Sequence, residues 1–295
     1  MKQLTVNSND AGQRIDKFLM KYFRSLPGGM IYKWLRKKRI RLNGVHPKND
    51  TFLRVGDVLE LYINDEFFPK EREIPEYIKT AAMPNIIYED KNIIIVNKPS
   101  GICAHDGADS LVNRILSYLY HKGEYDPAAE HTFAPALCHR IDRNTSGLVI
   151  AAKNATALRF FNEKIRLRQI RKIYYLYVEG ELEADSGVIE GYITKDNTQN
   201  KVIFSKTETP GSKHAVTSFK KVKDRVEAEL ITGRTHQIRA SFAYIGHPIC
   251  GDVKYGAKKD GGKSYQRLCA GKLIFDFCDR GEFEYLNGKT FEVRK

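Results

Sequence analysis

Residues 134–153 read APALCHRIDRNTSGLVIAAK, a polar segment followed directly by an apolar one. The apolar run 148–152 is too short for a helix and predicts a fully buried strand. The dipeptide Ser146-Gly147 predicts a turn into that strand. Because loops at the ends of buried strands often carry functional side chains, the polar segment is the first candidate site in the chain.

Within the polar segment, Asp142 lies two positions after Arg140 and one position before Arg143. Nearby cations favour the ionised form of a carboxyl group, even where part of its hydration is lost. On charge spacing alone, a surface turn with incidental ion pairs is the simpler interpretation. The charges by themselves therefore do not identify a catalytic loop.

The stretch HRIDRNTSGLVIAAKN, residues 139–154, closely resembles the signature loop of the RluA-type pseudouridine synthases. In that family the aspartate of an HR-x-D-R-x-TSGL loop is catalytic, and Asp142 occupies its position. The resemblance implies that Arg140 fills the space left by a flipped-out uridine, whose unstacking costs free energy. The other substrate contacts that it implies in this loop are His139, Arg143 and Thr145.

TGRTHQIR, residues 232–239, resembles a second motif of the same family, whose last arginine pairs with the catalytic aspartate. Arg239 is therefore the implied partner of Asp142, through a charge-assisted and possibly bidentate contact. The implied substrate contacts in this motif are Arg234, His236 and Gln237. Without the family, the motif equally predicts a helix capped by Thr235, with His236 and Arg239 on its solvated face.

Two further stretches extend the resemblance. RKIYYLYVEG, residues 171–180, places Tyr174 at the position of the family's active-site tyrosine, and NKPSG, residues 97–101, matches a motif that precedes the catalytic loop. The chain departs from the family at Ser241 and Cys269, where the family usually has histidine. Both departures leave the catalytic set in place, and they leave open which uridine is modified.

The chain has 295 residues, enough for about two domains, and a net charge of +13. Such an excess indicates a polyanionic partner, either nucleic acid or an anionic membrane surface. No apolar run approaches the roughly 18 residues of a spanning helix, and the N-terminus lacks the apolar core of a signal peptide. The five cysteines form no CxxC pair, which argues against a disulfide framework and a zinc site. We expect a monomeric, cytoplasmic protein that binds RNA, does not contact membranes and holds no metal.

Residues 1–64 are unusually basic, with 13 Lys and Arg against 5 Asp and Glu. Apolar residues at helical spacing predict a helix over 15–22 and another around Trp34, with Gly28-Gly29 breaking the first. A short strand then ends at the tight-turn dipeptide Asn43-Gly44.

The stretches GQRIDKFL, WLRKKRIRLNG and LRVGDVLEL resemble the small RNA-binding domain first known from ribosomal protein S-four. They lie between residues 12 and 63. The phosphate contacts expected from this basic cluster are Arg14, Lys33, Arg36, Lys37, Lys38, Arg39 and Arg41.

Residues 65–84 have an acidic excess and spaced prolines, and they predict an extended linker. From residue 85 onward strands predominate, with amphipathic helices over 112–119 and 158–165, and no regular alternation of strand and helix. This pattern favours an α+β fold. We expect a small basic α/β RNA-binding domain, residues 1–64, and a catalytic domain, residues 85–295, with a largely antiparallel mixed sheet flanked by helices.

The resemblance implies isomerisation of uridine to pseudouridine without a cofactor, and the chain carries no phosphate loop or dinucleotide fingerprint. Asp142 acts either as a nucleophile on the sugar or as a general base, and the sequence does not separate these roles. Large-subunit ribosomal RNA is the favoured substrate by family analogy, and tRNA is the alternative.

A catalytically inactive RNA-binding or ribosome-assembly factor is the competing hypothesis. Retention of Asp142, Tyr174 and Arg239 together argues against it, since an inactive copy need keep none of them. An esterase built on Ser146 is also disfavoured, because TSG is not the GxSxG elbow of such enzymes.

Overall fold

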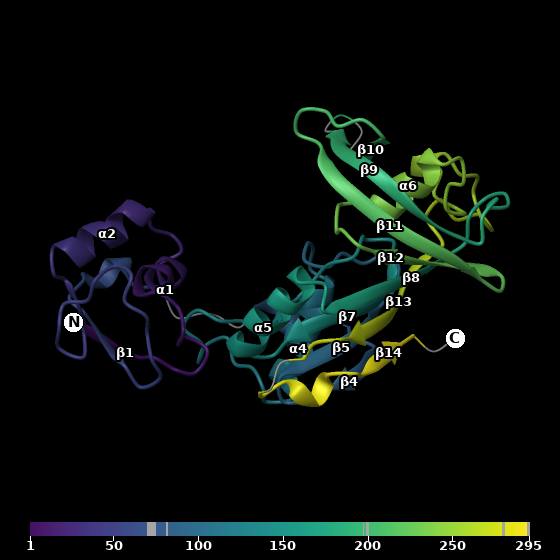
Figure 1. Cartoon of the computed structure of the whole chain (residues 1–295). Coiled ribbons are helices and arrows are strands. Elements are labelled where there is room, and N and C mark those ends of the chain that lie inside the picture. The colour runs from purple at the N-terminus through teal and green to yellow at the C-terminus, as the bar shows by residue number, and fades with distance from the viewer. Residues whose placement is uncertain (70–74, 81, 197, 199–200, 279–280, 294–295) are drawn as a thin grey trace.

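The computed structural model describes residues 1–69, 75–80, 82–196, 198, 201–278 and 281–293. Two bodies are joined by a narrow connection (Figure 1). The N-terminal body contains β1 (Lys2–Thr5), α1 (Ile15–Tyr22), α2 (Gly28–Arg36), β2 (Ile40–Leu42) and β3 (Val58–Leu61). Its antiparallel sheet has the order β1-β3-β2, and side chains of both helices and the sheet share one apolar core.

The break between α1 and α2 was predicted wrongly. The glycines lie in the first turn of α2, and Pro27 precedes that turn in an extended conformation. Glycine is a poor helix former, but the burial of Ile31 and Trp34 outweighs this local preference. The tight turn at Asn43-Gly44 is confirmed, since both residues have positive φ values of 51° and 79°, as a type I′ turn requires.

Asp10 connects the N-terminal body to the rest of the chain. Its carboxylate is fully buried. It accepts a hydrogen bond of 2.8 Å from the Thr132 hydroxyl, and Nδ1 of His131 lies 2.7 Å from its second oxygen. The His131 ring also makes edge contacts with Phe18 and Tyr22. A buried carboxylate is costly without such partners, so these contacts offset the cost of burying Asp10.

The segment 65–84 is not extended throughout. It contains the 3-10 turn Asp65–Phe67, beside which Phe68 enters the N-terminal core, and the short helix α3 (Glu76–Thr80). Ile78 of α3 is fully buried, and its carbonyl accepts a hydrogen bond of 2.7 Å from Ser117. Residues 70–74 and 81 of the predicted linker lie outside the described residues. The buried side chains of Phe68 and Ile78 therefore anchor this segment, although its prolines and charges predicted an extended linker.

The second body is built on a large sheet with the strand order β10-β9-β11-β12-β8-β13-β7-β5-β4, in which β14 adds to β13 and β6 adds to β7. The described pairs are antiparallel except β13 with β7. The predicted α+β class is thereby confirmed. The strands are β4 (Ile86–Glu89), β5 (Ile93–Lys98), β6 (Ala136–Leu137), β7 (Ser146–Ala152), β8 (Ile170–Leu176), β9 (Ser186–Asp196), β10 (Lys201–Ser205), β11 (Lys213–Val222), β12 (Arg225–Leu230), β13 (Leu268–Phe275) and β14 (Thr290–Glu292).

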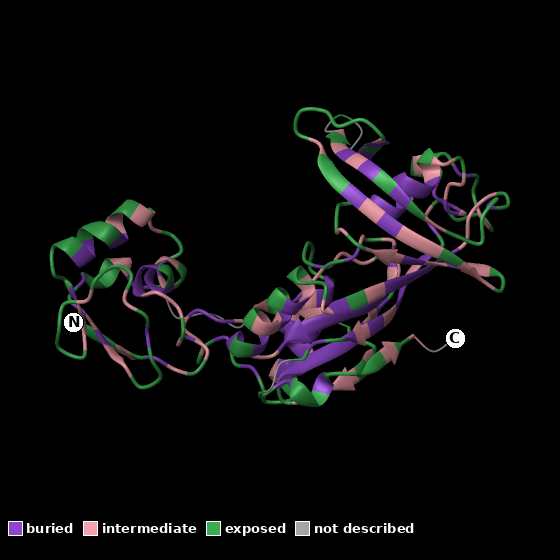
Figure 2. Ribbon diagram, viewed as in Figure 1, coloured by how far each residue is buried: buried purple, intermediate pink, exposed green. Residues whose placement is uncertain are grey.

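Helices α4 (Leu111–His121), α5 (Ala155–Arg166) and α6 (Gln237–Tyr244) pack on this sheet. Ser110 and Asn154 cap α4 and α5 through their side chains. Neighbouring residues of β5 and β7 join different cores on the two sides of the sheet, which makes these strands the most buried part of the molecule (Figure 2). No helix in the described ranges is long and apolar enough to cross a membrane.

Ser146 and Gly147 belong to strand β7 and not to the turn before it. The turn lies earlier, where the Thr145 amide donates to the Asp142 carbonyl at 3.1 Å. Gly147 has φ +117°, and a Cβ there would collide with the backbone of Ala270 in β13. The glycine is therefore required by the close approach of two strands, a long-range contact that local sequence does not reveal.

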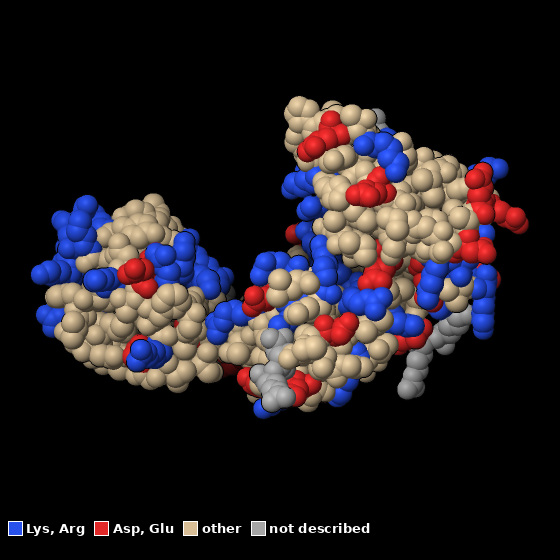
Figure 3. Space-filling model, in the orientation of Figure 1, with Lys and Arg blue, Asp and Glu red and all other residues tan. Residues whose placement is uncertain are grey.

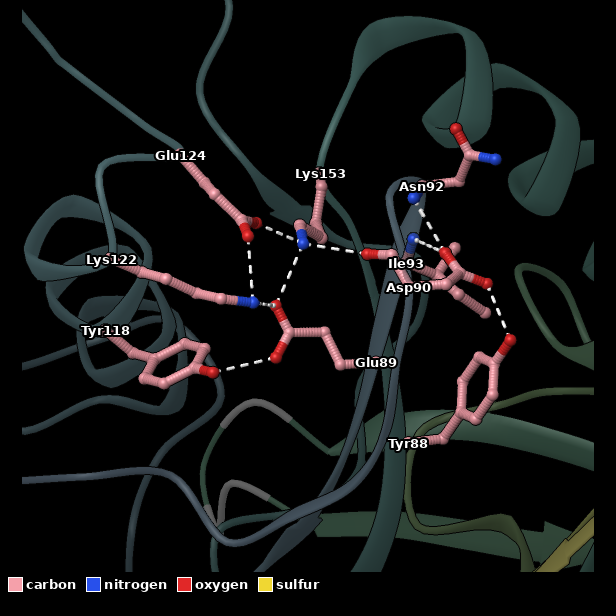
Figure 4. Close-up of polar contacts among 9 residues, drawn as sticks. All are labelled: Tyr88, Glu89, Asp90, Asn92, Ile93, Tyr118, Lys122, Glu124 and Lys153. Atoms are coloured by element: carbon pink, nitrogen blue, oxygen red, sulfur yellow. Dashed lines mark hydrogen bonds and ion pairs between the residues drawn. The ribbon is translucent and has the colours of Figure 1, made fainter.

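A compact ionic cluster fixes the end of α4 to the sheet (Figure 4). Glu89 of β4 accepts hydrogen bonds from Lys122 at 2.8 Å, Lys153 at 2.9 Å and the Tyr118 hydroxyl at 2.8 Å. Glu124 pairs with both lysines. Despite the opposing effect of burial, these donors lower the pKa of Glu89 to about 2. Two carboxylates thus face two ammonium groups, and each charge in the cluster is matched.

Candidate active site

A pocket of about 390 Å³ brings together the polar loop after β6, strand β8 and the start of α6. Its lining includes Asp142, Tyr174 and Arg239, the three residues predicted as catalytic. A larger groove of about 840 Å³ is lined by Tyr175 and Cys269. Their neighbours in the sequence, Tyr174 and Leu268, line the smaller pocket. The smaller pocket is the stronger candidate, because it gathers ionisable side chains that burial perturbs.

Asp142 and Arg239 meet although 97 positions separate them. Nη1 of Arg239 lies 3.5 Å from Oδ2 of Asp142, whose side chain is 27% exposed. The bidentate contact that was considered for Asp142 forms instead with Asp252, at 2.7 Å and 2.8 Å. Burial lowers the pKa of Arg239, but the hydrogen bonds to Asp252 outweigh this and raise it. The guanidinium is thus oriented by Asp252 and presents its remaining nitrogen to Asp142.

The start of α6 explains why Arg239 points inward. His236 occupies the position before the helix in a left-handed conformation, with φ 51°. Arg239 then falls on a helix face that is almost wholly buried, with an exposed fraction of 6%. The expectation of a helix capped by Thr235, with Arg239 on a solvated face, is therefore wrong. Helical spacing could not show this, because α6 buries most of its circumference against β9, β10 and β11.

Tyr174 and Lys172 project from the same face of β8 into the pocket. Burial, followed by the charge of Asp142, raises the pKa of Tyr174, so its hydroxyl stays protonated. The Tyr174 ring also belongs to the apolar core between the sheet and α6. It can therefore offer a fixed aromatic surface beside the carboxylate of Asp142.

Two histidines line the pocket. Nε2 of His236 is 3.8 Å from Oδ2 of Asp142, and its Nδ1 contacts the Tyr255 hydroxyl at 2.9 Å. Burial lowers the pKa of His236, against the opposing effect of Asp142. Nε2 of His139 accepts the Ile150 amide at 3.2 Å, which holds the start of the loop against β7.

The remaining predicted contacts divide into three groups. Arg140 is exposed at the pocket, and Arg234 lines it while its Nε donates to the His214 carbonyl. Thr145 and Gln237 are buried and engaged within the protein: the Thr145 hydroxyl accepts from Gln266, and the Gln237 amide bridges Thr232 and Thr217. Arg143 does not line the pocket, because its Nε turns away to the Gly101 carbonyl at 2.9 Å.

The two departures from the family pattern lie beside the site. Ser241 is fully buried in α6, and its hydroxyl has no hydrogen-bond partner among the described residues. Cys269 is half-buried in β13, opposite Ser146. Neither position supplies a charged group, so the departures leave the ionic arrangement around Asp142 unchanged.

The basic residues predicted for the N-terminal body lie mostly on its surface. Lysines and arginines gather around α2 (Figure 3), and those whose side chains are exposed are Lys33, Arg36, Lys37, Lys38 and Arg39. Arg41 is half-buried and packs over the Tyr62 ring at 5.3 Å. Arg14 differs, because its Nε and Nη2 donate hydrogen bonds of 3.1 Å and 2.8 Å to the buried carboxylate of Asp16. Its charge is therefore matched inside the fold.

Residues 92–244, about half of the chain, match the model of the RNA pseudouridylate synthase family. The chain is also 36% identical to an uncharacterized RNA pseudouridine synthase of Mycoplasma capricolum, over 98% of this chain and 96% of the relative. It is 33% identical to the ribosomal large subunit pseudouridine synthase C of Escherichia coli, over 88% of this chain and 81% of the relative.

The chain belongs to the RNA pseudouridylate synthase family. It is accordingly an isomerase that acts on RNA, and the family predicted from its sequence is confirmed. Its fold is similar to that of the human RNA pseudouridylate synthase domain containing 4, with a TM-score of 0.55 and 22% identity over 71% of this chain and 88% of that one.

Sequence reasoning missed three groups in this synthase: Asp252, Lys172 and Tyr255. Asp252 orients Arg239, and Tyr255 contacts both His236 and the Arg239 guanidinium, over which its ring lies at 4.8 Å. Both follow α6, at the start and end of the short 3-10 helix Val253–Tyr255, which is too short for periodicity to mark a buried residue. The available signal for Lys172 was its position two residues before Tyr174 on a strand, which places both side chains on one face. Among the described residues no group of His, Cys, Asp and Glu is placed to hold a metal ion.

Proposed function

We propose that this synthase isomerises specific uridines of large-subunit ribosomal RNA and that Asp142 carries the reaction. The observation that supports it most directly is a partly exposed carboxylate held 3.5 Å from a buried, oriented arginine inside a pocket with a tyrosine wall. The relatives named as ribosomal large subunit pseudouridine synthase C support the choice of RNA.

In this mechanism Asp142 acts on the sugar of a flipped-out uridine, either by attacking C1′ or by removing a sugar proton. Arg239 keeps the carboxylate ionised and aimed, and Tyr174 packs against the base while it turns. Arg140, exposed at the mouth, occupies the space that the uridine leaves in its helix. Apolar walls such as Ile141 and Leu268 limit the access of water, which would otherwise hydrolyse the intermediate.

The N-terminal body is proposed to hold RNA by its phosphates. The exposed lysines and arginines around α2 support this, because none of the five forms an ion pair with a described residue. Such contacts position a substrate without reading its sequence. We further propose that the protein works as a monomer in the cytoplasm, where its five free cysteines would stay reduced.

The deciding experiment maps pseudouridine in total RNA from cells with and without this protein. We expect one or more positions of large-subunit rRNA to lose the modification and to regain it when the wild-type chain is restored. Loss at tRNA positions alone would replace the proposed substrate, and an unchanged map would favour a binding factor without synthase activity. Addition of the purified chain to an unmodified rRNA transcript provides the matching test outside the cell.

A further inference from the structure

The side chain of Lys172 brings an ammonium group to the active-site pocket. It lies on β8 two positions before Tyr174, and both side chains line the pocket with Asp142. None of the described residues forms a hydrogen bond or an ion pair with this ammonium. The described part of the fold therefore supplies a cation to the site without a counter-ion for it.

The surroundings of Lys172 disfavour its charge. Burial lowers the pKa of Lys172 to about 8, and the positive charge of Arg168 adds to the effect. Burial likewise lowers the pKa of His139, whose Nδ1 has no hydrogen-bond partner in the described part of the chain. The other ionisable groups that line the pocket are Arg140, Asp142, Tyr174, Arg234, His236 and Arg239. A desolvated ammonium of this kind is costly unless an anion joins it, which points to a charge carried by the substrate.

The reaction creates such a charge for a limited time. Breaking the bond between uracil N1 and ribose C1′ leaves the electron pair on the base, where it spreads over N1 and the two carbonyl oxygens. C1′ is then either bonded to the Asp142 carboxylate or part of a glycal formed by loss of the C2′ proton. Reattachment forms the C5–C1′ bond while the ester bond between C1′ and Asp142 breaks or, in the glycal route, while C2′ regains the proton it lost. C5 then loses its proton and N1 gains one. The detached base is anionic only between these events.

We propose that Lys172 is the counter-ion of the detached uracil, to which its ammonium donates a hydrogen bond at a carbonyl oxygen. The inference rests on the proposed reaction at Asp142. Because the charge on the base appears only after the bond breaks, the interaction raises kcat and contributes little to RNA affinity. A phosphate oxygen of the target nucleotide has the same chemistry, and the experiment below separates the two sources.

The test compares Lys172→Met and Lys172→Arg with wild type on an unmodified large-subunit rRNA transcript. In single-turnover reactions we expect Lys172→Met to be slower by about 100-fold, as for loss of a donor to a developing anion. Lys172→Arg should recover part of the rate, since it restores the charge. The RNA dissociation constant should change less than about threefold in both. The matched control is Arg168→Gln, which removes a nearby exposed cation and should leave the rate within about threefold of wild type.

A second substrate distinguishes a catalytic counter-ion from a structural lysine. 5-Fluorouracil is more acidic than uracil and leaves more readily, so the gap between wild type and Lys172→Met should shrink when the transcript contains 5-fluorouridine and loss of the starting nucleoside is followed. An equal gap with both substrates would overturn the proposal. So would an unchanged rate at saturating RNA with weaker binding and a smaller salt dependence, which identifies a phosphate contact. If wild type itself is inactive on the transcript, the proposed substrate has failed instead.

Discussion

Two ionic clusters in the second body use similar residues in opposite ways. Around Glu89, two carboxylates face two ammonium groups, and Lys153 and Glu89 have exposed side-chain fractions of 7% and 13%. Around Asp142, the arginine gives its two short contacts to Asp252, the carboxylate is 27% exposed, and Lys172 has no partner among the described residues. Within the described part of the chain, every charge of the first cluster has a partner, and the second cluster leaves Lys172 without one.

This difference suggests that the charges around Glu89 stabilise the fold, whereas those around Asp142 are available to a substrate. A matched cluster gains its stability when the chain folds, and has no remaining capacity for a ligand. An incomplete cluster costs stability, and it recovers that free energy only when a substrate supplies the missing charge or a transition state develops one. Substitutions in the two clusters should therefore separate activity from stability.

Asp142→Asn should give the largest effect on activity. The substitution keeps the shape of the side chain and removes the charge that acts on the sugar, so we expect turnover to fall by a factor on the order of 10⁴ or more. The free energy of unfolding should change little, because the carboxylate is partly exposed. Pseudouridine release from an unmodified transcript and denaturant unfolding measure the two quantities. Appreciable turnover by the purified Asn variant would contradict the role of Asp142.

Asp252→Asn should give an intermediate loss of activity by disturbing Arg239. Without the bidentate carboxylate, the buried guanidinium loses its orientation, and we expect kcat to fall about 10- to 100-fold, as for other residues that position an active group. Arg239→Lys should behave similarly, because an ammonium supplies charge without the planar fork. Both variants should retain the wild-type RNA dissociation constant. An effect confined to KM would show that the Asp252–Arg239 pair binds RNA and does not orient Asp142.

Glu89→Gln should reverse the pattern and affect stability alone. Removing one carboxylate leaves Lys153 buried with fewer partners, so we expect the free energy of unfolding at pH 7 to fall by about 1–3 kcal/mol. The pKa of Glu89 is depressed from 4.5 to about 2 by its donors. Its contribution is therefore present above pH 4.5 and is lost as pH falls toward 2, where variant and wild type should converge. Single-turnover activity should stay at the wild-type value, and a loss there would show that the two clusters are coupled.

The fold class was predictable because its signals are local. Strand β7 shows as an apolar run, the turn at Asn43-Gly44 has its dipeptide, and Asn154 stands where a helix needs a cap. The positions of Gly28-Gly29 and Gly147 were misjudged because tertiary contacts decide them. In a local pattern, glycine indicates a break. The packing of the core instead tolerates Gly28-Gly29 within α2, and the close approach of β13 to β7 requires Gly147.

The proposed catalytic set could be named only through the family motifs. Spacing did not show that Asp142 and Arg239 meet, because they lie on separate elements that the sheet brings together. Asp252 and Tyr255 carried no such motif and were missed, although they position Arg239 and His236. The sequence did not reveal the matched cluster around Glu89 either, because its members are far apart in the chain. Glu89 lies on β4, Lys122 and Glu124 follow α4, and Lys153 follows β7.

The smallest expected effect extends the same comparison to RNA binding. Lys37 and Lys38 are exposed and unpaired among the described residues, whereas Lys122 is held by Glu89 and Glu124. Each phosphate contact that is lost should reduce the slope of log affinity against log salt by about 0.7–0.9. If both lysines bind phosphate, the double variant Lys37→Gln/Lys38→Gln should therefore lower this slope by about 1.4–1.8, twice the change for one contact. Lys122→Gln removes a lysine whose charge is already neutralised, so it should leave the slope unchanged. Titrations at several salt concentrations measure both, and an equal change in the two variants would mean that net charge alone, and not the surface around α2, controls RNA affinity.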